Sequence, residues 1–132
     1  MTKSEVLLSL KKLDSAKDRL KESLKNAQSQ LEWDGVIKRF EFTYDQLWKT
    51  LKIALSYYGV FCVNPRTCIK EAFKNNLIPE DEVLLDMLED RNETAHIYDE
   101  KTAEEVVERI KEVYEQVIEN VIVKLKEAFE KS

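Results

Sequence analysis

Glycine and proline are scarce in this sequence, with two of each among 132 residues. Tight turns between β-strands depend on such residues, so few hairpins can form. No hydrophobic run approaches the roughly 20 residues that a membrane-spanning helix needs, and we expect no membrane association. With 43% hydrophobic and 36% charged residues in helical spacing, the sequence predicts an all-α protein. The length fits one domain, which we expect to span residues 1–132.

Histidine and cysteine, the usual ligands of zinc, are also scarce. The chain has one histidine, His96, and two cysteines, Cys62 and Cys68, without C-x-x-C spacing. We therefore expect neither a metal site nor a cofactor. No secretory signal is evident, because Lys11 and Lys12 follow the first short apolar run at once. The chain is accordingly predicted to be cytoplasmic, with both thiols reduced and partly buried.

The charge is unevenly distributed along the chain. The net charge of −5 argues against a general nucleic-acid coat, because neutralisation of phosphates by Lys and Arg dominates such binding. Residues 1–74, however, carry a balance of +5, and residues 75–132 a balance of −10. Two interpretations stay open: a local basic wall in the first half, or solvated helix faces with an acidic half that keeps the protein soluble.

Two long helices are predicted in the first half. From Lys3 to Leu31, apolar residues recur every three, four or seven positions, which indicates an amphipathic helix. The segment Glu32 to Gly35 predicts a break, since Asp34 can cap a helix and Gly35 tolerates a turn. A second helix is then expected from about Val36 to Tyr58.

The second predicted helix carries a heavy aromatic load. Its core face includes Phe40, Tyr44, Trp48 and Tyr58. Filling the bundle centre is the simpler interpretation, and a base-stacking platform is the alternative. Arg39 and Glu41 flank Phe40 on different faces, so either could pair with a neighbouring helix or support a site.

Two shorter helices are expected next. Asn64 followed by Pro65 is a strong start signal, and the helix should end near residues 75–76. Its inward side chains would be Cys68, Ile69, Ala72 and Phe73. Pro79 and the acidic residues 80–82 open the following helix, since negative charge favours a helix N-terminus.

A last long helix is predicted from a capping box at Thr102 to Glu105. Apolar residues then recur in nearly unbroken heptad steps, at Val106, Ile110, Val113, Val117, Val121, Leu125 and Ala128. A second line widens this face, at Val107, Tyr114, Ile118, Ile122 and Phe129. More surface is apolar than one neighbouring helix can cover, so it forms either the middle of a bundle or a subunit interface.

The only histidine lies in the stretch R-N-E-T-A-H-I-Y, residues 91–98. In a helix, Asn92 would lie one turn below His96, whereas Arg91 would lie about 140° round the axis, so it must reach round or the helix must loosen. An imidazole that titrates near neutral pH beside a forked cation would suit a phosphate. Alternatively, His96 and Arg91 are ordinary helix-end residues that pair with nearby carboxylates, those of Glu89, Asp90, Glu93, Asp99 and Glu100.

The stretch 91–98 resembles the R-x4-H-x-Y signature of the HEPN superfamily, in the version with Asn directly after Arg. Three further stretches resemble one branch of it, the nucleotidyltransferase substrate-binding proteins. They are Arg39-Phe40-Glu41 leading to Trp48-Lys49-Thr50-Leu51-Lys52, then Asn64-Pro65-Arg66 leading to Glu71-Ala72-Phe73-Lys74, and Leu85-Asp86-Met87-Leu88-Glu89-Asp90. The likeness covers about residues 5–130.

The resemblance implies an up-and-down antiparallel bundle of four to five helices that forms a homodimer with the two signatures facing each other. It also implies a partner, a small nucleotidyltransferase. Many such pairs are toxin and antitoxin, in which the HEPN member is a metal-independent ribonuclease. In some pairs the nucleotidyltransferase adds AMP to the signature tyrosine, which is Tyr98 here. The older family name instead treats the helical subunit as the substrate-recognition half of a nucleotidyltransferase.

Metal-free RNA cleavage requires a base, an acid and a cation. His96 could act as base or acid and Arg91 as the clamp, while Asn92 could hold the imidazole tautomer or contact the phosphate. Tyr98 could orient the substrate or carry the AMP. Because each chain has one histidine, two-imidazole chemistry would need two subunits. Three functions compete: a dimeric endoribonuclease, a non-catalytic module that presents RNA or a nucleotide, and a bundle that serves assembly alone.

Overall fold

The computed structural model describes residues 1–96 and 99–130, and every regular element in that part is helical. The elements are α1 (Lys3–Leu24), α2 (Gln30–Tyr57), α3 (Pro65–Lys74), α4 (Glu82–Glu93), the 3-10 turn η1 (Thr94–His96), α5 (Glu100–Arg109), the π-helical segment η2 (Ile110–Tyr114) and α6 (Glu115–Glu130). No helix among the described residues is both long enough and apolar enough to cross a membrane.

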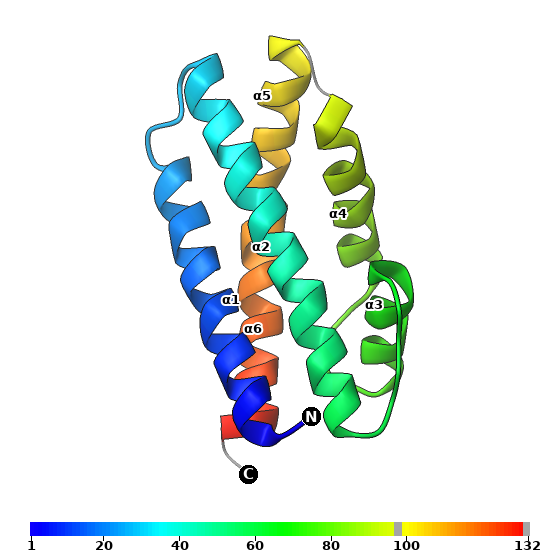
Figure 1. Cartoon of the computed structure of the whole chain (residues 1–132). Coiled ribbons are helices and arrows are strands. Elements are labelled where there is room, and N and C mark those ends of the chain that lie inside the picture. Colours follow the sequence, from blue (N-terminus) through cyan, green and yellow to red (C-terminus); the bar gives the residue numbers. More distant parts are fainter. Residues whose placement is uncertain (97–98, 131–132) are drawn as a thin grey trace.

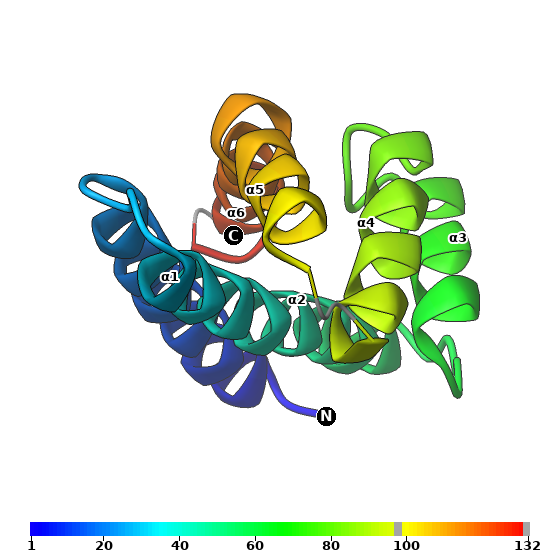
Figure 2. The same ribbon diagram turned by 90° about the horizontal axis from the view of Figure 1, so that it is seen from above.

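The helices form an antiparallel bundle. In Figure 1, α1 runs up, α2 runs down, α4 runs up, and α5 with α6 runs down again. Seen from above in Figure 2, α1 and α2 form one layer, α5 and α6 lie behind it, and α3 and α4 stack beside them. The predicted all-α, up-and-down bundle is therefore confirmed.

The core is built by apolar side chains from all six α-helices. Phe40 and Tyr44 of α2 are fully buried, which confirms the simpler interpretation of the aromatic load for these two rings. The Tyr44 hydroxyl donates a hydrogen bond of 2.8 Å to the carbonyl of Leu84 and so ties α2 to α4. Burial raises the pKa of Tyr44. Its proton therefore stays in place as a donor at neutral pH.

The break between α1 and α2 comes earlier than predicted. Ser29 is the N-cap of α2, and its hydroxyl oxygen accepts a hydrogen bond from the backbone N–H of Glu32. The Glu32 carboxylate in turn accepts from the Ser29 hydroxyl. This local pairing outcompetes Asp34 as a start signal. The predicted break at residues 32–35 and the predicted helix start at Val36 are wrong.

Cys62 and Cys68 are joined by a disulfide, so the expectation of two reduced thiols is wrong in this structure. Cys62 lies in the connector after α2, and Cys68 lies on α3, whose start at Asn64 and Pro65 is as predicted. The Asn64 side chain accepts from the backbone N–H of Thr67 and fixes this first turn. The two Cα atoms are thereby 5.1 Å apart, within the span of a disulfide.

The last helix also begins earlier than predicted. Asp99 is its N-cap, since its carboxylate accepts from the backbone N–H of Thr102, which lies inside α5 rather than at its start. The segment η2 then changes which residues face inward. Val113, predicted to be buried, is 42% exposed, whereas Tyr114 is buried. Three other predicted inward residues, Leu31, Tyr58 and Phe73, are exposed as well.

Breaking the disulfide should lower the free energy of unfolding by about 2 kcal/mol, because it closes a short loop, with a sequence separation of 6, in the unfolded chain. Urea unfolding with and without a reductant measures this difference. The double variant Cys62→Ser with Cys68→Ser is the control, and its midpoint should not respond to the reductant. Equal midpoints for the unmodified chain under both conditions would contradict the expectation.

Candidate functional site

The end of α4 and the turn η1, which together carry signature residues 91–96, lie at the end of the bundle far from both termini (Figure 1). Helix α4 ends at Glu93, and residues Thr94–His96 tighten into η1. The Thr94 hydroxyl shares its one proton between the carboxylate of Glu41 and the carbonyl of Arg91, the latter at 2.8 Å. The bond to Arg91 occupies a carbonyl at the helix end, where partners are otherwise missing. The helix thus changes form between Arg91 and His96, but it tightens into a 3-10 turn, whereas the sequence had allowed for a loosening.

The guanidinium of Arg91 reaches helix α2. Its Nε and Nη2 atoms donate to the two carboxylate oxygens of Asp45 at 3.2 and 3.1 Å, and Nη1 donates to Glu41 at 3.4 Å. The hydrogen bonds to Asp45 raise the pKa of Arg91. Of Arg39 and Glu41, either of which could have paired with a neighbouring helix, Glu41 does so. The carboxylates that Arg91 contacts lie on α2, so the alternative interpretation, in which Arg91 pairs with carboxylates adjacent in sequence, does not hold.

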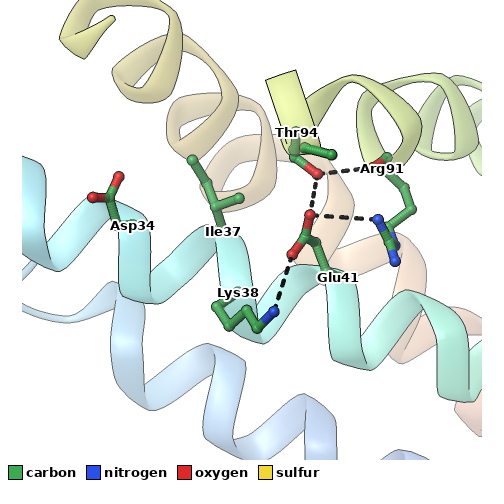
Figure 3. A pocket seen from close by; sticks show the side chains of 7 residues that line it. Asp34, Ile37, Lys38, Glu41, Arg91 and Thr94 are labelled. Atoms are coloured by element: carbon green, nitrogen blue, oxygen red, sulfur yellow. Dashed lines mark hydrogen bonds and ion pairs between the residues drawn. The ribbon is translucent and has the colours of Figure 1, made fainter. Parts of the chain in front are cut away.

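Glu41 connects three side chains, as Figure 3 shows. One of its oxygens accepts from the hydroxyl of Thr94 and from Arg91, and the other lies 4.0 Å from the Nζ atom of Lys38. A first pocket of about 430 Å³ opens here, lined by Asp34, Ile37, Lys38, Glu41, Arg91, Thr94 and Ala95. Two cations and two carboxylates line it, so its charge is balanced.

Asp90, the residue before Arg91, points towards α5 and η2 instead of α2. Its carboxylate accepts from Nε and Nη2 of Arg109 at 2.9 Å each, and it also accepts from the hydroxyl of Tyr114. Burial, together with the bond to Asp90, raises the pKa of Tyr114. The Tyr114 ring stacks on Phe40 with centroids 5.6 Å apart. The last turn of α4 is therefore clamped between α2 on one side and α5 with η2 on the other.

The other predicted site residues are not drawn into this network. His96 and Asn92 are exposed, and neither side chain makes a hydrogen bond or ion pair with another described residue. Arg39 is exposed and lines a second pocket together with Arg91. Tyr98 lies outside the described residues. The structure thus joins Arg91 to Glu41 and leaves the imidazole open to solvent.

Sequence reasoning missed two residues that hold Arg91 in place. Asp45 lies four residues after Glu41, so helical spacing places both carboxylates on one face of α2, and this signal could have found it. Thr94 lies within the signature, but only its contact with Glu41 gives it a role.

The pairing of Arg91 with Asp45 should stabilise the fold by about 1 kcal/mol, since it is bidentate and half-buried. A double-mutant cycle of Arg91→Met and Asp45→Asn in urea unfolding measures this coupling. The pair of Lys25 with Glu22, whose side chains are 62% and 75% exposed, is the control and should couple by only a few tenths of that value. Equal coupling in the two cycles would refute the anchoring role.

Comparison with known proteins assigns the chain to a family. The family model described as "nucleotidyltransferase substrate binding protein like" matches residues 8–127. The fold is also similar to a crystal structure from Thermus thermophilus, with 30% identity, 86% of this chain and 98% of that chain covered, and a TM-score of 0.79. No curated protein matches the chain in sequence. Because the family model spans nearly the whole chain, the protein belongs to the nucleotidyltransferase substrate-binding-protein-like family.

Proposed function

We propose that the chain is the HEPN-type subunit of a two-component module with a small nucleotidyltransferase, and that its homodimer is a metal-independent endoribonuclease. The family description supports the association with a nucleotidyltransferase. The observation that supports ribonuclease activity is the contrast between two neighbouring side chains at the end of α4. Arg91 is fixed by α2, while the imidazole of His96, just beyond it, is open to a substrate.

The reaction is an internal transesterification. One imidazole takes the proton of the 2′-hydroxyl, the 2′-oxygen bonds to phosphorus, and the bond from phosphorus to the 5′-oxygen breaks. A second imidazole, protonated, gives its proton to the leaving 5′-oxygen. The products are a 2′,3′-cyclic phosphate and a 5′-hydroxyl. Arg91 supplies positive charge near the phosphorus, and the exposed amide of Asn92 is available to the phosphate or to His96.

Two imidazoles require two chains, because each chain has one histidine. Exposure of His96 at the end of the bundle leaves it accessible to a second copy, and this supports a homodimer with the signatures face to face.

Regulation by the partner follows from the signature alone. We propose that the nucleotidyltransferase silences the ribonuclease by adding AMP to Tyr98, so that the pair acts as toxin and antitoxin in the cytoplasm. Tyr98 lies outside the described residues, and the sequence pattern is the support for its role.

A non-catalytic subunit that presents RNA or a nucleotide to the nucleotidyltransferase is the second candidate. The contacts of Arg91 favour it, because two carboxylates, Glu41 and Asp45, already bind the guanidinium. A cation so neutralised stabilises the charge growing on a phosphate less well than a free one.

Replacing the imidazole should abolish cleavage. We expect the purified chain to cut labelled RNA in EDTA and to leave 2′,3′-cyclic phosphates, and His96→Ala to be slower by about 10²- to 10⁴-fold, the usual contribution of a general acid or base. Product ends are identified on denaturing gels before and after phosphatase treatment.

The control is Lys70→Ala, which removes an exposed cation on α3 and should cut at the unmodified rate. Cleavage by His96→Ala at that same rate would reject the role of the histidine. If no variant cuts and the unmodified dimer carries no AMP, the non-catalytic subunit is the better description.

A further inference from the structure

A second pocket lies along α2 and shares three lining residues with the first. Its volume is about 460 Å³, and it is lined by Gly35, Lys38, Arg39, Glu41, Phe42, Asp45 and Arg91. Lys38, Glu41 and Arg91 line both pockets, and Figure 3 shows these three from the side of the first pocket. The second pocket therefore lies directly beside the clamped guanidinium. Its size is that of a small-molecule site.

Phe42 gives this pocket an accessible aromatic wall. Its side chain is 59% exposed, whereas Phe40 and Tyr44 on the same helix are fully buried. Gly35 lies seven residues earlier, two turns along the same face of α2. A Cβ atom at Gly35 would meet nothing within 4 Å, so the pocket is open on that side. The ring thus remains available to a flat ligand.

The charge of the second pocket differs from that of the first. Three cations line it, Lys38, Arg39 and Arg91, against two carboxylates, Glu41 and Asp45, which leaves one positive charge in excess. The first pocket is balanced, and the chain as a whole carries −5. An anionic ligand is therefore favoured in the second pocket over the first.

We propose that the second pocket binds a nucleotide, with its base stacked on Phe42 and its phosphate on Lys38 and Arg39. These two cations lie four and three residues before Phe42, on the same face of α2. Stacking on an aromatic ring beside basic side chains is a recurrent way to hold single nucleotides. Exposed Lys49, seven residues after Phe42, continues the basic line along the helix.

This inference deepens the proposed function and rests on it for the source of the nucleotide. The source is either a base of single-stranded RNA beside the cleavage site, or a free nucleotide that the nucleotidyltransferase partner uses. Both sources share the chemistry of a flat base with an anionic phosphate, and their binding to the pocket can be compared directly.

The test measures binding in the His96→Ala background, in which RNA stays intact. A short fluorescein-labelled single-stranded RNA is followed by anisotropy, and AMP by calorimetry. Phe42→Ala should lower the affinity for the nucleotide by about 5- to 150-fold, the usual cost of losing one stacked base. Phe42→Tyr keeps the ring and should retain binding. Arg39→Gln should weaken binding and reduce its salt dependence.

Phe61→Ala is the matched control, since Phe61 is 84% exposed but lies outside the pocket, in the connector beyond α2. It should bind as the parent does. Unchanged binding by Phe42→Ala would overturn the proposal. So would a change of Phe42→Ala from dimer to monomer in sedimentation without nucleotide, because the ring would then belong to a protein contact.

Two further comparisons separate the sources and the hypotheses. Tighter binding of RNA than of AMP, lost in part with Lys49→Ala, identifies RNA as the source, whereas equal binding of the two identifies a free nucleotide. Binding in the His96→Ala background does not depend on cleavage. Conversely, if Phe42→Ala cleaved RNA with the same KM as the unmodified chain, the nucleotide site at Phe42 would be rejected. The ribonuclease activity would be retained.

Discussion

Two adjacent side chains of opposite charge fix the last turn of α4 in the bundle. Arg91 is bound by the carboxylates of α2, and Asp90 is bound by Arg109 and Tyr114 on the opposite side. Successive residues of a helix point about 100° apart, so one turn of backbone can be held from two directions at once. The turn η1, which follows directly and ends at His96, is attached to the bundle through this turn.

The clamp divides the candidate site into an ordered half and an open half. Hydrogen bonds to Asp45 and Glu41 leave the Arg91 guanidinium little freedom, and a fixed geometry is what the proposed contact with a phosphate would require. His96 has no such partner among the described residues. A single chain therefore offers a fixed cation and an uncommitted imidazole, and the proposed two-imidazole chemistry would require a second chain.

Predictions from the sequence succeeded where the signal was local and unopposed. Asn64 with Pro65 starts α3 because one residue caps the helix and the next has its backbone angle preset. The start of α2 was wrong because two signals lie within a few residues, and the hydrogen bonds between Ser29 and Glu32 decide between them. Local spacing could not reveal the disulfide, which depends on how the connector meets α3.

The sequence identified several residues of the candidate site but not the contacts between them. Arg91 and Glu41 were named from the sequence, but their union depends on α4 packing beside α2, a contact across 50 positions of the chain. Phe42 gave no signal, because its position outside the apolar stripe is typical of an ordinary surface residue. Its exposure matters only beside the pocket that Arg91 helps to build.

The π-helical segment from Ile110 to Tyr114 joins α5 and α6 into one continuous helix and rotates the side chains of α6 about the helix axis relative to those of α5. A single extra residue in a turn rotates all that follows by about 100°. The buried positions Ile110, Tyr114 and Ile118 follow one another in steps of four, which an unbroken α-helix would carry gradually off the core. The wider turn absorbs that drift. The apolar face of α6 therefore stays turned towards the core, and the buried ring of Tyr114 lies at the end of the wider turn that makes this possible.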